Sequence, residues 1–172
     1  NTTKIEVEKM RLNEKVLYKT VDINILNMAL FMKAIDLAKN RYFLEAIDKL
    51  TELTVFNPSF TDAYYQRGHC KELYNISKGE LIFDPLEDYL KAIEVNPAFP
   101  WGWYYIGIKH TNIDTKKAKE YIKYAQDLFL IQQDYDNFSI VESCLKNFDQ
   151  NLKNFEEEQN KILGKIKRFF NY

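Results

Sequence analysis

The sequence is poor in cysteine, glycine and proline. Two cysteines, Cys70 and Cys144, are too few for a disulfide framework or a cysteine-rich zinc site. The five glycines are scattered along the chain, so no glycine-rich loop is present that could cradle a phosphate. With only four prolines in addition, the chain lacks the frequent turn signals that an all-β sandwich requires.

Charge and hydropathy give no sign of nucleic acid or membrane as a partner. The 24 basic and 25 acidic side chains leave a net charge of −1, so the basic excess of a nucleic-acid-binding protein is missing. The longest strongly apolar stretch, near Leu26 to Ile35, is interrupted by Asn27 and Lys33 and is far short of the roughly 20 residues of a membrane span. We therefore expect no nucleic-acid partner and no membrane span. The sequence does not identify the compartment; a soluble, intracellular protein, cytoplasmic or organellar, is favoured.

Side chains that could carry catalysis or hold a metal are few. His69 and His110 join the two cysteines as the only nitrogen and sulfur ligands in the sequence. His69 and Cys70 are adjacent, and adjacent residues of a helix point about 100° apart. No spacing pairs a cysteine with a histidine as nucleophile and base. The sequence thus predicts no metal, no cofactor and no enzymatic activity.

Apolar residues recur at intervals of three and four along most of the chain, which is the spacing of amphipathic helices. The pattern predicts two helices within residues 24–56, separated by a left-handed stop at Asn40-Arg41. Helix-start signals follow at a capping box over residues 59–62, at Asp84-Pro85, at Pro100 and at Asp114. Residues 75–83 interrupt the helical period and predict a surface excursion.

The chain also repeats itself at an offset of 39 residues. The segment 57–60 (Asn-Pro-Ser-Phe) superposes on 96–99 (Asn-Pro-Ala-Phe), Tyr65 falls on Tyr104, and Gly68 falls on Gly107. A repeated pair of helices with a small residue at a fixed place indicates a stacked helical repeat protein.

This pattern resembles the tetratricopeptide repeat. In that family the first helix carries a large residue and a small one four positions on, and the second helix carries small, large and small residues before a proline. Three units in phase show the pattern: Leu30, Ala34, Ala46, Leu50, Leu53 and Pro58; then Tyr64, Gly68, Pro85, Tyr89, Ala92 and Pro97; then Trp103, Gly107, Ala118, Ile122 and Ala125. The resemblance covers about residues 27–132. It implies an all-α fold of three tandem helix-turn-helix repeats in a short right-handed superhelix.

The resulting organisation has three parts. Residues 1–23 are predicted to form an N-terminal arm or short helix. Residues 24–134 hold the repeats, over about 27–60, 61–99 and 100–132. Residues 135–172 are predicted to form a long C-terminal capping or coiled-coil helix, opened by a capping box at 139–142. Its apolar residues follow a heptad with one polar seam position, Gln159: Val141, Leu145, Phe148, Leu152, Phe155, Ile162, Ile166 and Phe169.

The first helices of such repeats line a concave face, and the resemblance implies which residues point into it. These form an apolar, aromatic groove, which we predict to be the partner-binding site: Phe31, Met32, Ile35, Tyr65, Gln66, His69, Trp101, Tyr104, Tyr105 and Ile108. An apolar surface of this size requires a cover. Either a partner helix or peptide covers it, or the chain's own arm or tail does.

Three functions without catalysis are compatible with such a groove. The first is a scaffold or adaptor that binds a protein or peptide, most simply an amphipathic helix. The second is a structural subunit of a larger assembly whose groove is filled by its own arm or tail, and the third is a secretion chaperone of this repeat type. Members of the family that hold the C-terminal carboxylate of heat-shock chaperones use a two-carboxylate clamp of lysine, asparagine and arginine side chains. The resemblance implies which positions here correspond to that clamp, and none carries a cation, so this partner is excluded: Phe31, Ile35, Gln66, Trp101 and Tyr105.

Overall fold

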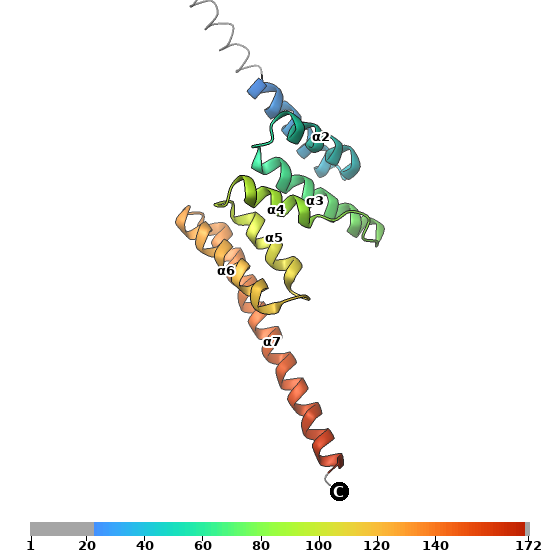
Figure 1. Cartoon of the computed structure of the whole chain (residues 1–172), viewed down its shortest axis with the longest axis vertical. Helices are drawn as coiled ribbons and strands as arrows, with labels where there is room; N and C mark the ends of the chain where they lie inside the picture. Colours follow the sequence, from blue (N-terminus) through green and yellow to red (C-terminus); the bar gives the residue numbers. More distant parts are fainter. Residues whose placement is uncertain (1–22, 171–172) are drawn as a thin grey trace, which may run out of the picture. The chain divides into compact units, whose positions relative to one another are not determined.

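The computed structural model describes residues 23–170, and every regular element in that range is an α-helix (Figure 1). The all-α prediction is therefore confirmed. The predicted N-terminal arm, residues 1–23, lies almost entirely outside the described residues. The chain divides into two compact units, one ending at Pro97 and the other beginning at Ala98.

The first unit is built from two helix pairs. A helix over residues 23–39 is followed by α2 (Phe43–Phe56), then α3 (Thr61–Lys78) and α4 (Leu86–Val95). The predicted left-handed stop is confirmed at Arg41, whose φ is 66°. The core between the helices is made of small and branched side chains that are buried: Ala34, Ala46, Ile47, Leu50, Leu53, Ala63 and Cys70.

The second unit comprises α5 (Pro100–His110), α6 (Thr115–Ile131) and α7 (Tyr135–Phe170). Its core joins Ile122 and Phe129 of α6 to Val141 of α7, and all three are buried. The long C-terminal helix is confirmed. It has 36 residues, which corresponds to about 54 Å at a rise of 1.5 Å per residue.

Two of the predicted helix starts are confirmed by their hydrogen bonds. The Asp114 carboxylate accepts from the backbone N–H of Lys117 at 3.1 Å and caps α6. The Asp84 carboxylate accepts from the backbone N–H of Leu86 at 2.9 Å, at the start of α4. Both carboxylates satisfy an N–H that the first helical turn cannot pair.

The two predicted capping boxes are wrong. At the start of α3 the N-cap residue is Phe60, and the Ser59 hydroxyl instead donates to the side-chain oxygen of Asn57 at 2.8 Å. The long helix α7 begins before the second box, where Asp134 accepts from the Asn137 N–H at 3.2 Å. Ser139 is therefore already inside the helix, and its hydroxyl donates back to the carbonyl of Tyr135.

The predicted excursion at 75–83 begins later than the sequence pattern indicates. Helix α3 continues to Lys78, and Gly79 ends it in the left-handed conformation with φ 70°. Asn75 is buried on the inner side of this turn. Its amide nitrogen donates to the carbonyl of Phe83 at 2.7 Å, and its oxygen accepts from the N–H groups of Ile82 and Phe83. One side chain thus replaces the backbone pairing that the loop lacks.

Helices of a pair approach so closely that no side chain fits at two positions. A Cβ at Gly68 of α3 would lie 2.8 Å from the Tyr89 ring of α4. A Cβ at Gly107 of α5 would lie 2.6 Å from Cγ1 of Ile122 and 2.9 Å from the Ala118 carbonyl oxygen of α6. These are the two glycines that the repeat pattern aligns, and the contacts give the physical reason for them.

A buried ion-pair network crosses the first unit. Asp88 of α4 is 1% exposed. Arg67 of α3 donates to one of its carboxylate oxygens through Nε at 3.0 Å and Nη2 at 2.6 Å, and Lys71 Nζ lies 2.8 Å from the other. Arg67 also donates to the Thr54 hydroxyl of α2 at 2.9 Å. The network therefore links α2, α3 and α4.

We predict that Gly107→Ala lowers the free energy of unfolding by about 1–3 kcal/mol, because the new methyl group meets backbone that cannot move aside. Gly164 in α7 is the matched control, since a Cβ there meets nothing within 4 Å. Gly164→Ala should stabilise by about 0.5–1 kcal/mol through helix propensity. Denaturant unfolding followed by circular dichroism measures both. Equal changes in the free energy of unfolding for the two variants would show that α5 and α6 do not approach closely at Gly107.

We predict that Asp88→Ala destabilises the first unit by about 3–5 kcal/mol, since it leaves two half-buried cations without their acceptor. Glu94→Ala on the same helix is the control. It breaks an ion pair of 2.7 Å to Lys91 in which the Glu94 side chain is 68% exposed, and should cost less than about 1 kcal/mol. Thermal and denaturant unfolding compare the two, and a loss no larger for Asp88→Ala than for Glu94→Ala would contradict the role of the network.

Candidate functional site

The first unit carries a hollow of about 370 Å³ between the 23–39 helix and α3. Three residues of the first helix and four of α3 line it: Ile35, Ala38, Lys39, Tyr65, Gln66, His69 and Leu73. On each helix the lining positions are three or four residues apart or adjacent, so each set shares one helical face. The walls are mainly apolar, with an amide, an imidazole and an ammonium group among them.

Four of the residues predicted to bind a partner line this hollow, namely Ile35, Tyr65, Gln66 and His69. The other two predicted residues of this unit lie next to it on the 23–39 helix. Phe31 packs on the core, and its ring centroid is 5.2 Å from that of Phe60. Met32 is 61% exposed.

An exposed apolar stripe continues the hollow along the 23–39 helix. Met28, Met32 and Ile35 are spaced four and three residues apart and therefore share a face. Met28 is 53% exposed, although it is a large apolar side chain. We refer to these three residues as the methionine stripe. Together with the hollow it forms an apolar surface of the kind that marks interaction sites on proteins.

The ring of His69 stacks on the ring of Tyr65, with centroids 6.2 Å apart and planes inclined by 13°. Burial lowers the pKa of His69, because desolvation penalises the charged imidazolium, and the nearby Glu72 carboxylate opposes this in part. The same carboxylate accepts a hydrogen bond of 3.0 Å from the hydroxyl of Tyr89. His69 is thus favoured in its neutral form, as an aromatic part of the wall.

The predicted residues of the second unit lie together on α5 and are half-buried: Trp101, Tyr104, Tyr105 and Ile108. Trp101 makes an edge contact with Phe129 of α6, with ring centroids 5.1 Å apart. The Tyr104 hydroxyl donates to the sulfur of Cys144 on α7 at 3.6 Å. Burial, and then this hydrogen bond, raises the pKa of Tyr104. The first part of α7 therefore packs against the face on which these side chains lie.

Three residues of the hollow were not among those predicted from the sequence: Ala38, Lys39 and Leu73. The helical spacing of the sequence could have identified them. Ala38 and Lys39 follow Ile35 by three and four positions, and Leu73 follows His69 by four, so each continues a face already identified. They extend the site toward the C-terminal ends of their helices.

Residues 23–170 contain neither a cluster of metal ligands nor a long apolar helix. No group of three or more histidine, cysteine, aspartate or glutamate side chains within residues 23–170 could hold a metal ion. Burial raises the pKa of the Cys70 thiol to about 11, which keeps it protonated and unreactive at neutral pH. None of the described helices is both long and apolar enough to cross a membrane.

No protein-family model and no curated protein matches this sequence, but solved structures do. The type III secretion translocator chaperone SycD of Yersinia enterocolitica matches with a TM-score of 0.62 and 13% identity, over 73% of this chain and 92% of that one. PcrH in complex with the chaperone binding region of PopD matches with a TM-score of 0.61 and 12% identity, over 72% of this chain and 91% of that one. The Sgt2 TPR domain of Aspergillus fumigatus matches with a TM-score of 0.59 and 16% identity, over 76% of this chain and 82% of that one. The predicted tetratricopeptide-repeat-like fold is confirmed.

We predict that His69 makes the first unit sensitive to acid. The unfolded chain binds a proton at the ordinary pKa of 6.5, whereas the folded form binds it less tightly. Stability is therefore unaffected above 6.5, falls as the pH decreases through 6.5, and loses nothing more from this group below the folded pKa. Thermal unfolding across this range should show a smaller acid loss in His69→Gln than in the unsubstituted chain. Parallel pH profiles for the two would contradict the burial of His69.

Proposed function

We propose that the chain is a non-catalytic adaptor that binds a helix or peptide of a partner protein on the first unit. The observation that carries the proposal is the continuity of the hollow with the methionine stripe. An apolar pocket that opens onto an exposed apolar stripe along a helix suits an amphipathic partner segment, whose apolar residues recur along one face.

The chemistry of the hollow indicates what the partner presents. Ile35 and Leu73 offer apolar walls, and the Tyr65 ring offers a flat apolar face with a polar tip. One large apolar side chain of the partner fits among them, stabilised by about 25 cal/mol for each Å² of apolar area buried. Lys39 at the border favours an acidic residue beside this anchor. Methionine side chains adapt their shape, so the stripe tolerates several apolar partners.

The comparisons support binding of this kind without identifying the partner. PcrH was solved with the chaperone binding region of PopD, so a protein of this fold holds a segment of another protein. SycD is a translocator chaperone of similar fold. A secretion chaperone is therefore the second candidate function, and on both readings the chain binds a protein segment without transforming it.

In the second unit, the contacts of the aromatic face favour packing within the unit over binding of a partner. Contacts of Trp101 and Tyr104 with their own unit, including the bond to Cys144 of α7, support the alternative in which the tail fills this part of the groove. We therefore assign partner binding to the first-unit residues and a packing role to Trp101 and Tyr104. The C-terminal carboxylate of heat-shock chaperones is not proposed as a partner, since the five positions that correspond to its clamp are uncharged.

A displayed library of amphipathic helical peptides tests the proposal. We predict that peptides selected on the unsubstituted chain share one large apolar anchor next to an acidic residue. Ile35→Asp should weaken their binding at least about tenfold, or about 1.4 kcal/mol, because it places a charge in the apolar wall. Tyr65→Ala should weaken it as well, by removing the flat face of the hollow.

Tyr135→Ala is the matched control, since Tyr135 is 61% exposed and belongs to the other unit. It should leave peptide binding unchanged, and circular dichroism should show that all variants retain their helices. Selected peptides that bind the Ile35→Asp and Tyr65→Ala variants as tightly as the unsubstituted chain would place the binding site elsewhere.

A further inference from the structure

The apolar seam of α7 is covered along its first half and exposed along its second. Val141 is fully buried in the core of the second unit, and Leu145 packs against that core. Further along, Phe155 is 59% exposed and Ile162 is 52% exposed. Figure 1 shows that α7 continues well past the end of the α5–α6 pair. The heptad continues without a break over both halves.

The seam passes from covered to exposed beside the turn between α5 and α6. There a hollow of about 340 Å³ is lined by Thr111, Asn112 and Thr115 on one side and by seam residues of α7 on the other. Those seam residues are Phe148, Leu152 and Phe155. Past Phe155, the described residues of this unit no longer cover the seam. The second half of α7 thus presents a heptad face that lacks the helix a coiled-coil seam requires.

We propose that this segment, residues 152–169, pairs with the same segment of a second copy of the chain as an antiparallel coiled coil. The segment is 18 residues of helix, about 27 Å long at 1.5 Å per residue. In the antiparallel register that matches the heptad, Gln159 is level with Ile162 of the second copy, and Ile162 with Gln159.

The distribution of charge selects the antiparallel direction. Glu156, Glu157 and Glu158 stand in the first part of the segment, and Lys165, Lys167 and Arg168 in the last part. A parallel pair in register would place each cluster against its own copy, which is repulsive. An antiparallel pair brings the acidic part of each copy to the basic part of the other. Glu158 and Lys165 both occupy the heptad position that flanks the seam, and such positions face each other across an antiparallel pair.

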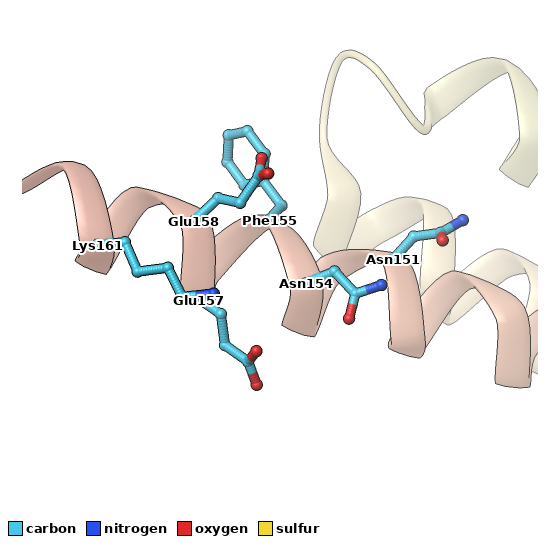
Figure 2. A pocket seen from close by; sticks show the side chains of 6 residues that line it. All are labelled: Asn151, Asn154, Phe155, Glu157, Glu158 and Lys161. Carbon is cyan, nitrogen blue, oxygen red and sulfur yellow. The ribbon is translucent and has the colours of Figure 1, made fainter.

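The side chains of α7 show which glutamate takes part. Figure 2 draws six residues around a surface hollow beside α7, all from this one helix. Phe155 and Glu158 project to the same side, so Glu158 borders the seam. Glu157 projects to the opposite side, away from Phe155. The two neighbouring glutamates therefore differ in the role that the proposal gives them, which provides a matched control.

The full-length chain is tested by sedimentation equilibrium over about a hundredfold range of concentration, because self-association depends on concentration by mass action. We expect a monomer–dimer equilibrium. Ile162→Glu should leave only monomer, since it puts a charge in the seam. Glu158→Lys should raise the dissociation constant about tenfold or more, because it sets a lysine against Lys165 of the second copy.

The swap variant Glu158→Lys with Lys165→Glu should recover dimerisation, since the antiparallel pairing is restored. Glu157→Lys makes the same change of charge outside the seam and should leave the mass unchanged. A chain that is monomeric over the whole range would overturn the proposal. A dimer that Ile162→Glu does not dissociate, or a swap that does not recover the loss, would overturn it as well.

Discussion

The structure depends on how closely the two helices of a pair approach each other. At Gly68 and Gly107 the partner helix occupies the space that a Cβ would need, with atoms at 2.8 and 2.6 Å. Tyr89 and Ile122 are the large side chains that fill these places, and both are fully buried. A larger residue at either glycine would force the helices apart and leave the small residues of the partner helix, such as Ala92 or Ala118, without contacts. The alternation of small and large residues is thus a requirement of packing in both units.

The close approach of α3 and α4 at Gly68 also positions the buried carboxylate of Asp88. A Cβ at Gly68 would lie 3.1 Å from Cβ of Asp88, so the glycine allows Asp88 to stand next to α3. From there its carboxylate reaches both Arg67 and Lys71, one turn apart on that helix. A buried carboxylate without cations would be strongly destabilising, whereas one that is fully paired holds its helices in a single register. Arg67 extends the effect to α2 through Thr54.

Much of this fold follows from local sequence signals, and the deviations have local causes. The stop at Arg41 and the cap at Asp114 are confirmed, because each depends on a residue next to the helix end. The capping box at 59–62 fails since Asn57 takes the Ser59 hydroxyl. The extent of α3 and the pairing of Arg67 with Asp88, 21 residues apart, depend on tertiary contacts that no short pattern contains. The hollow has the same character: periodicity identifies the faces of its two helices, but their separation comes from packing.

Helix α7 shows why one sequence pattern can serve two purposes. The heptad predicts an apolar face but does not say whether that face packs on the chain's own helices or on another chain. The lengths decide this, because α6 has 17 residues and α7 has 36, so α6 can cover only the first part of the seam. Val141 and Leu145 set the rotation of α7 about its axis by packing on the core. Since the heptad is continuous, the same packing sets the direction in which Phe155 and Ile162 face. The core of the second unit thereby orients a surface that lies outside it.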